Sequence, residues 1–141
     1  DNRKYNMFKK IKDIIGNLSG INVAILGLSF KPETDDMRDS PSIEIIEQLI
    51  KAKAILKAYD PAAMNEAKKV LPKSIHYVTG TEECLNGADI AVILTEWNEF
   101  RALEPEFIFN KMKGDIVVDL RNIFNPLSMK NAGLHYISIG R

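Results

Sequence analysis

Short, almost continuous apolar runs recur along this sequence and alternate with segments of helical periodicity. The runs over residues 22–28 and 89–94 lack a period-two alternation, which is typical of β-strands covered on both faces. Between them, isoleucines and leucines follow Ser40-Pro41 at helical spacing, after a serine suited to the N-cap and a proline suited to the first helical turn. Strands that alternate with helices predict an α/β fold, a doubly wound and mostly parallel sheet with helices on both faces.

The same periodicities assign elements along the whole chain. We expect helices over 5–18, 41–50, 62–71, 81–85 and 105–112, and strands over 22–28, 54–59, 75–78, 89–94, 115–120 and 134–139. No internal repeat and no Pro/Ser-rich linker interrupts the 141 residues, so one compact α/β unit is expected.

The charge balance excludes several classes of protein. Nineteen basic residues match nineteen acidic ones, so the sequence lacks the excess positive charge of a general binder of nucleic acid or anionic membranes. No apolar run approaches the roughly 18 residues that span a bilayer, and the first four residues lack a signal-peptide core. We therefore expect a cytoplasmic protein that binds neither nucleic acid nor membrane. Because the chain does not begin with methionine, we expect a processed chain or an excised domain.

Polar side chains follow several of the predicted strands. In doubly wound sheets, ligands bind outside the carboxyl ends of the strands. The residues expected at that edge are Phe30 and Lys31, Asp60, Thr95-Glu96-Trp97, Arg121 and Asn122. Lys31 and Arg121 offer cations for a phosphate, and Phe30 offers a surface on which a base could stack.

The turn after the first strand lacks the dinucleotide fingerprint. It reads Gly27-Leu28-Ser29-Phe30-Lys31, with one glycine where G-x-G-x-x-G needs three. A pyrophosphate therefore cannot lie tightly on this turn, and the fold is expected to be Rossmann-like without the fingerprint. Packing of Phe30 in the core is the alternative to a binding role, and the adjacent Lys31 favours binding.

The loop over residues 30–42 is dense in charge. We expect Asp35 or Asp36 to hold Arg38 and cap neighbouring backbone, which is a structural role, and we favour a functional role for Arg38.

Five motifs together resemble the C-terminal, UDP-binding domain of the UDP-glucose/GDP-mannose dehydrogenase family. They are Gly27-Leu28-Ser29-Phe30-Lys31-Pro32, Arg38-Asp39-Ser40-Pro41-Ser42, Ala58-Tyr59-Asp60-Pro61, Thr95-Glu96-Trp97-Asn98-Glu99-Phe100 and Asp119-Leu120-Arg121. The similarity runs from about residue 21 to the C-terminus and is greatest to the UDP-glucose 6-dehydrogenases, with members acting on UDP-N-acetylmannosamine as the alternative. It implies a UDP-sugar-binding domain over 21–141 and the tail of an interdomain connecting helix over 1–20.

The resemblance also implies roles for individual residues. Phe30 and Lys31 match a pair that contacts the nucleotide of the UDP-sugar, and Arg121 matches an arginine that also contacts the substrate. Arg38 matches an arginine that reaches toward NAD, a cofactor bound mainly by an N-terminal domain.

Members of the family oxidise the sugar C6 alcohol to a carboxylate with two NAD molecules, and they form homo-oligomers. Their catalytic cysteine and its helper residues lie in a segment that this sequence does not contain. The chain is therefore expected to carry no catalytic residue and to be inactive alone.

Other candidate residues point to structural roles. Cys84 lies among acidic residues with no histidine beside it, so we expect a partly buried thiol with a raised pKa rather than a nucleophile. His76 and His135 lack ligands at metal-binding spacing. Trp97 is expected in the core or an interface, and Asp60 is expected to end a strand and cap the next helix.

A phospho-receiver-like signalling module is the alternative from a different functional class. Such a module is also doubly wound, and Asp35-Asp36, Asp60 and Thr95 invite the comparison. The order of these residues argues against it, because the candidate phosphate acceptor follows the second strand instead of the third.

Overall fold

The computed structural model describes the backbone of residues 2–138 and the side chains of residues 8–138. Its centre is a six-stranded sheet with the order β3-β2-β1-β4-β5-β6, in which every neighbouring pair of strands is parallel. The strands are β1 (Asn22–Leu26), β2 (Ile55–Tyr59), β3 (His76–Tyr77), β4 (Ile90–Ile93), β5 (Ile116–Asp119) and β6 (His135–Ser138). The mostly parallel sheet that we predicted is therefore parallel throughout. The direction of strand addition reverses between β1 and β4, which is the topological switch point of a Rossmann-type fold.

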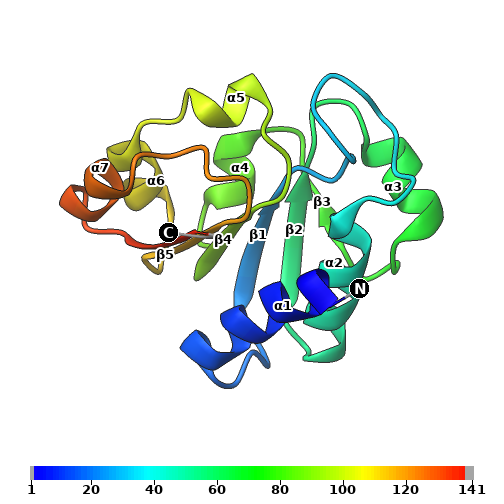
Figure 1. Ribbon diagram of the computed structural model, residues 1–141, viewed down its shortest axis with the longest axis horizontal. Coiled ribbons are helices and arrows are strands. Elements are labelled where there is room, and N and C mark those ends of the chain that lie inside the picture. The colour runs from blue at the N-terminus through cyan, green and yellow to red at the C-terminus, as the bar shows by residue number, and fades with distance from the viewer. Residues whose placement is uncertain (1, 139–141) are drawn as a thin grey trace.

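Helices cover both faces of the sheet (Figure 1). They are α1 (Asn2–Ile15), α2 (Pro41–Lys51), α3 (Met64–Val70), α4 (Thr81–Leu85), α5 (Asn98–Arg101), α6 (Pro105–Lys111) and α7 (Pro126–Asn131). Helices α5 and α7, of four and six residues, were not predicted, because segments this short show little helical periodicity; α4 is equally short but was predicted. In α7 the local signals are nonetheless present, since Asn125 caps the helix and Pro126 begins it.

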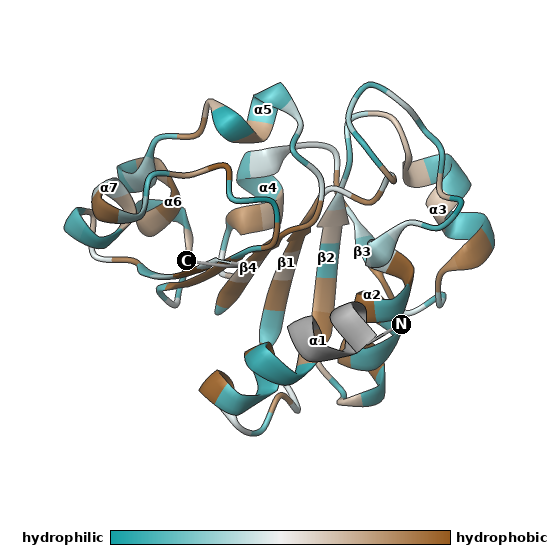
Figure 2. Ribbon diagram, viewed as in Figure 1, coloured by the Kyte–Doolittle hydropathy of each residue, from teal (hydrophilic) through white to brown (hydrophobic). Residues whose placement is uncertain are grey.

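Two hydrophobic cores lie on opposite faces of the sheet, and β1 contributes to both. Val23 and Ile25 pack with α1, α2 and α3, whereas Ala24 and Leu26 pack with α4, α5, α6 and α7. The strands in the middle of the sheet are mostly apolar along their length (Figure 2). This burial on both sides is the reason that the strand sequences show continuous apolar runs.

Some predicted boundaries are wrong. The first helix ends at Ile15 rather than at residue 18, because Gly16 adopts a positive φ of 81° and its N–H closes the last turn on the carbonyl of Lys12. The third strand has only two residues instead of four. Phe8 and Ile11 of α1 are buried in the core of the first face, so α1 packs onto the sheet and its helices. The assignment of residues 1–20 to the tail of a connecting helix stays a prediction.

Because the strands are parallel, their carboxyl ends all lie along one side of the sheet, which we call the carboxyl edge. The loops that follow β1, β2, β4 and β5 lie at this edge, and those after β1, β2 and β4 form the top of Figure 1. No helix among the residues described is long and apolar enough to cross a membrane.

Candidate functional site

Asp60, directly after β2, organises the carboxyl edge. Its side chain is fully buried, and each carboxylate oxygen accepts several hydrogen bonds. Oδ2 accepts from the backbone N–H groups of Leu28 and Ser29, from the Ser29 hydroxyl and from the Trp97 indole, and Oδ1 accepts from the N–H groups of residues 62 and 63. The prediction that Asp60 ends the strand is confirmed, but the prediction that it caps the next helix is wrong. The N-cap position of α3 is Ala63, which makes no side-chain cap, and Asp60 instead caps the turn that leads into this helix. The structure adds that this carboxylate joins the loops after β1, β2 and β4.

The N-terminus of α2 is closed by its own side chains. The hydroxyl oxygen of Ser40 accepts from the N–H of Ser42, Pro41 has no N–H, and both serine hydroxyls donate to the carbonyl of Leu28. The N–H groups that hold a pyrophosphate in the dinucleotide fold are therefore already used or missing here. This agrees with the absence of the three-glycine fingerprint.

Arg121 is held in place by the turn after β5. Buried Asp119 accepts a hydrogen bond from the backbone N–H of Arg121, and its other carboxylate oxygen accepts from the N–H groups of residues 123 and 124 and from the Tyr136 hydroxyl. The backbone of the Asp119-Leu120-Arg121 motif is thus fixed at the carboxyl edge.

The side chain of Arg121 forms a bidentate ion pair with Glu96, which follows β4. Nε lies 2.6 Å from Oε2 and Nη2 lies 2.9 Å from Oε1, and both side chains are about three-quarters covered. Hydrogen bonding to the guanidinium lowers the pKa of Glu96, an effect that partial burial opposes. Arg121, which the sequence presented as a cation for a phosphate, already has a carboxylate partner. Sequence reasoning placed Glu96 at this edge without a role.

Arg38 forms a similar pair with Asp36, two residues earlier in the same loop. The prediction that Asp35 or Asp36 holds Arg38 is confirmed for Asp36. The side chain of Arg38 is 89% exposed, and its hydrogen bond lowers the pKa of Asp36. The guanidinium therefore stands in solvent, in reach of a partner that approaches the loop.

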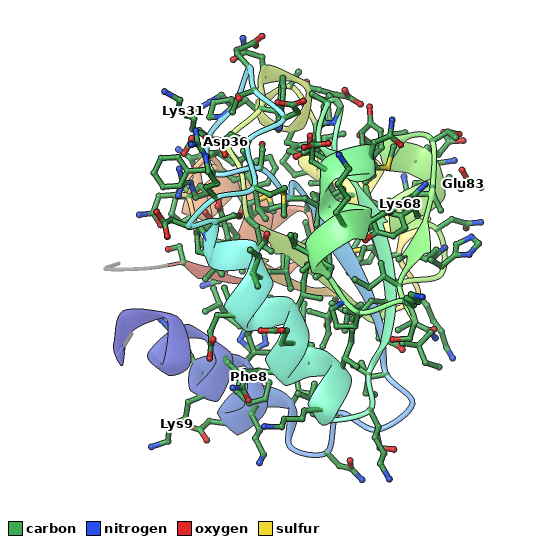
Figure 3. All side chains as sticks on the ribbon, turned by 90° about the vertical axis from the view of Figure 1, so that its right-hand side faces the viewer. Phe8, Lys9, Lys31, Asp36, Lys68 and Glu83 are labelled. Carbon is green, nitrogen blue, oxygen red and sulfur yellow. The ribbon has the colours of Figure 1, made fainter. Side chains whose placement is uncertain are left out.

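Phe30 and Lys31 are exposed at the carboxyl edge. Phe30 is 45% exposed, so the alternative that it packs in the core is wrong. Lys31 lies in the same loop as Asp36, at the end of the molecule opposite Phe8 (Figure 3). Among the side chains described, no hydrogen bond or ion pair engages the Lys31 ammonium, which leaves it available to an anion.

Two hollows at this edge differ greatly in volume. Arg121 lines a hollow of about 20 Å³ with two residues of α2 and with Leu94 and Leu120, which directly follow β4 and β5; this hollow holds about one water molecule. Arg38 lines a hollow of about 540 Å³ between its loop and α3. A nucleotide that uses Arg121 therefore lies on the surface of this edge and not in a closed pocket of it.

Cys84 is more buried than predicted. It has no exposed surface, its Sγ lies 3.5 Å from the carbonyl oxygen of Ile25, and burial raises the pKa of its thiol to about 12. The expected direction is confirmed, but the main cause is wrong. Desolvation dominates, Glu83 contributes least, and Lys57 opposes the shift.

The structure predicts a nearly inert thiol. With a pKa raised from 9.0 to about 12, the thiolate fraction at pH 8 falls about 1000-fold, so a disulfide reagent should label native Cys84 at least that much more slowly than the urea-unfolded chain. Ser74→Cys, at an exposed position, is the control, and its added thiol should react with one equivalent of the reagent at once. Labelling of the native chain at the rate of the unfolded chain would contradict this assignment.

Two other sequence-based interpretations are also settled by the geometry. Trp97 is buried and belongs to the core, as predicted. Asp60 is buried with both oxygens engaged, so it cannot accept a phosphoryl group, and this removes the main support for a receiver-like module. Among the residues described, no group of three histidine, cysteine or acidic side chains is placed to hold a metal ion.

Comparison with known proteins places the chain in a family. A UDP-glucose 6-dehydrogenase of Rhizobium meliloti is 43% identical over an alignment of 142 positions, which covers all of this chain and 32% of that protein. A UDP-glucose dehydrogenase structure from Pyrobaculum islandicum superposes with a TM-score of 0.79 at 30% identity, covering 95% of this chain and 28% of that one. An NDP-N-acetyl-D-galactosaminuronic acid dehydrogenase structure from Methanosarcina mazei superposes with a TM-score of 0.83 at 26% identity, covering 99% of this chain and 29% of that one.

The chain thus spans about a third of the length of the curated relatives that it matches. Residues 24–126 match the UDP-binding domain described for the UDP-glucose/GDP-mannose dehydrogenases. That match contains Phe30, Lys31, Arg38, Glu96 and Arg121, so the polar residues of the carboxyl edge lie within it. On this evidence the chain belongs to the UDP-glucose/GDP-mannose dehydrogenase family.

Proposed function

We propose that the carboxyl edge of this chain binds the UDP part of a UDP-sugar, within an NAD-dependent dehydrogenase that oxidises UDP-glucose to UDP-glucuronate. The observation that carries the proposal is an exposed aromatic residue at position 30 and, at position 31, an exposed ammonium that no side chain within the described part of the chain engages. Both lie on the same edge as the ordered guanidinium of Arg121. A flat ring suits a uracil base, and two cations suit a diphosphate.

The polar groups of this edge have two roles: the cations bind the ligand, and the buried carboxylates hold the loops that carry those cations. Lys31 contributes a mobile point charge, whereas Arg121 contributes a planar fork whose orientation is set before the ligand arrives. Asp60 and Asp119 are fully buried and act on the loops that carry these cations. In this proposal the chain binds and orients the nucleotide, and another segment of the enzyme performs the oxidation.

NAD belongs mainly to a different part of the enzyme in this proposal. The capped N-terminus of α2 and the single glycine of its turn do not fit a pyrophosphate. Arg38 is the residue of this chain that fits a contact with the cofactor, because its guanidinium is exposed beside a hollow of about 540 Å³. NAD accepts hydride during the oxidation, and Arg38 would help to hold the two parts of the enzyme together around it.

The identity of the sugar rests on sequence similarity. The fold does not select it, because the structure from Methanosarcina mazei, named for a different sugar acid, superposes as well as the UDP-glucose dehydrogenase from Pyrobaculum islandicum. UDP-glucose is favoured because the relatives over 40% identical are named UDP-glucose 6-dehydrogenases. A UDP-N-acetylmannosamine enzyme is the alternative. An N-terminal NAD-binding domain, a homo-oligomeric enzyme and a cytoplasmic location are part of the proposal and rest on family membership.

Titration with UDP tests the nucleotide site directly. Lys31→Ala and Arg121→Ala should each weaken binding by roughly 1.5–3 kcal/mol, which is about 10- to 150-fold in Kd, because each removes a charge-assisted contact to phosphate. The measurement is calorimetry of the 141-residue chain, with amide shifts at residues 30, 31 and 121 reporting the location.

Lys73→Ala is the matched control for this titration. It removes the same charge from an exposed position just before β3, at the opposite edge of the sheet, and should leave the Kd unchanged. Wild-type affinity in both the Lys31 and Arg121 variants would overturn the proposed site.

A further inference from the structure

The ion pair of Arg121 engages only one edge of its guanidinium group. The two bonds to Glu96 come from Nε and Nη2, which form the side edge of the planar fork. Among the side chains that the structure describes, Nη1 has no hydrogen-bond partner, and Nη2 has a second hydrogen. The end edge, formed by Nη1 and Nη2, therefore keeps two parallel N–H donors, which match two oxygens of a phosphate group.

Glu96 is itself held by the segment that carries it. Its neighbour Thr95 is fully buried and donates its hydroxyl hydrogen to the carbonyl of Ser29. On the other side, the Trp97 indole donates to Asp60. Glu99 extends the anchoring to α5, because it accepts from the hydroxyls of Tyr59 and Thr81. The residues on both sides of Glu96 are thus anchored by hydrogen bonds, and the backbone that carries its carboxylate is fixed.

The exposed pair at the same edge provides a contrast. Asp36 and Arg38 lie two residues apart on one loop, and Arg38 is 89% exposed, so this pair does not tie two separate loops together. Glu96 and Arg121 come from loops after two different strands, 25 residues apart, and are both largely covered. A pair of this second kind fixes the direction in which the guanidinium points.

We propose that Glu96 is a positioning residue for the nucleotide site: it holds the side edge of Arg121 so that the end edge faces the diphosphate of UDP. This inference rests on the proposed function and assigns a role to a residue that does not contact the ligand. Arg121 is ordered before UDP arrives, so less conformational entropy is lost on binding than with a free arginine.

The positioning role predicts the direction in which removal of Glu96 changes the Kd for UDP. A carboxylate close to a phosphate repels it, so if Glu96 acted only through its charge, its removal would tighten UDP binding. If Glu96 acts by holding Arg121, its removal weakens UDP binding although a negative charge has been taken away. The two roles therefore predict opposite changes in Kd.

The experiment is a double-mutant cycle on the Kd for UDP. We expect E96Q to weaken binding roughly 10-fold, since the amide keeps the size of the side chain but offers one acceptor in place of two. E96D, which retains a carboxylate, should recover part of the loss. In an Arg121→Ala background E96Q should cause no further loss, because Glu96 acts through Arg121, and removal of the carboxylate's repulsion should there make binding equal or slightly tighter.

A spectroscopic signal and a matched control complete the design. The Nε–H resonance of Arg121 should be sharp in the wild type, broaden in E96Q and remain sharp in E96D. Glu66→Gln removes a carboxylate from another ion pair, with Lys69 on exposed α3, and should leave the Kd unchanged. Fluorescence of Trp97 checks the fold of each variant, and E96D carries the comparison if E96Q is unfolded.

The outcomes separate this inference from the proposed function. If the wild type fails to bind UDP, or Arg121→Ala binds it unchanged, the proposed function is wrong. If Arg121→Ala weakens binding but E96Q, or E96D in its place, binds as well as or better than the wild type, the function stands and the positioning role is overturned. An equal loss from E96Q with and without Arg121 also overturns it.

Discussion

The Asp60→Ala variant is expected to lose roughly 3–5 kcal/mol of the free energy of unfolding, because its truncation leaves several buried donors without an acceptor. In the wild type the carboxylate accepts from two backbone N–H groups of the β1 loop, from the Ser29 hydroxyl and from the Trp97 indole. It also accepts from the turn that leads into α3. With no side chain in their place, these groups face a buried space that water must enter.

Urea unfolding followed by tryptophan fluorescence measures this loss. The chain has a single tryptophan, and its indole N–H donates to Asp60, so the probe reports on the site itself. Asp60→Asn should lose less than the alanine variant, since the amide oxygen replaces one acceptor while the amide nitrogen opposes N–H groups.

Asp115→Ala is the matched control for Asp60. Asp115 is an exposed acid at the opposite edge of the sheet, and its loss should change stability by no more than about 0.5 kcal/mol. An Asp60→Ala variant as stable as this control would show that the carboxylate does not organise the edge.

A Gly27→Ala substitution should cost about 3 kcal/mol or more, from a strained backbone and a steric overlap together. Gly27 has a φ of 96°, a conformation that residues with a Cβ rarely adopt. A Cβ at this position would also lie 2.5 Å from Cβ of Thr95 and 2.6 Å from its backbone nitrogen. Trimming the threonine side chain cannot remove the second overlap, so β1 and β4 would have to separate at their carboxyl ends.

Gly20→Ala separates the two contributions. Gly20 has a φ of 78°, but nothing lies within 4 Å of the added Cβ, so its cost should be only the backbone penalty of about 1–2 kcal/mol. Thermal unfolding of both variants measures the difference. Equal costs would show that the close approach of Gly27 to Thr95 carries no energetic weight.

Local patterns in the sequence were enough to predict the fold class. Ile25 and Val92 lie in apolar runs that indicate strands buried on both faces, and Ser40-Pro41 marks the start of a helix. These patterns predict the elements correctly because the periodicity of apolar side chains, helix capping and the fixed φ of proline each depend on only a few neighbouring residues. The Asp36–Arg38 pair was predictable for the same reason, since its partners are two residues apart.

The tertiary structure decided the partners of the site. Arg121 pairs with Glu96 across 25 residues, and Asp60 accepts from Leu28 and Trp97 across 32 and 37 residues. Periodicity contains no information about which loops meet, because that depends on the strand order, and the strand order is set by how the helices pack on both faces. The sequence by itself determined that cations and carboxylates follow the strands of a parallel sheet. Only the folded arrangement determined which carboxylate holds which cation, because hydrogen bonds act over about 3 Å in space whatever the separation along the chain.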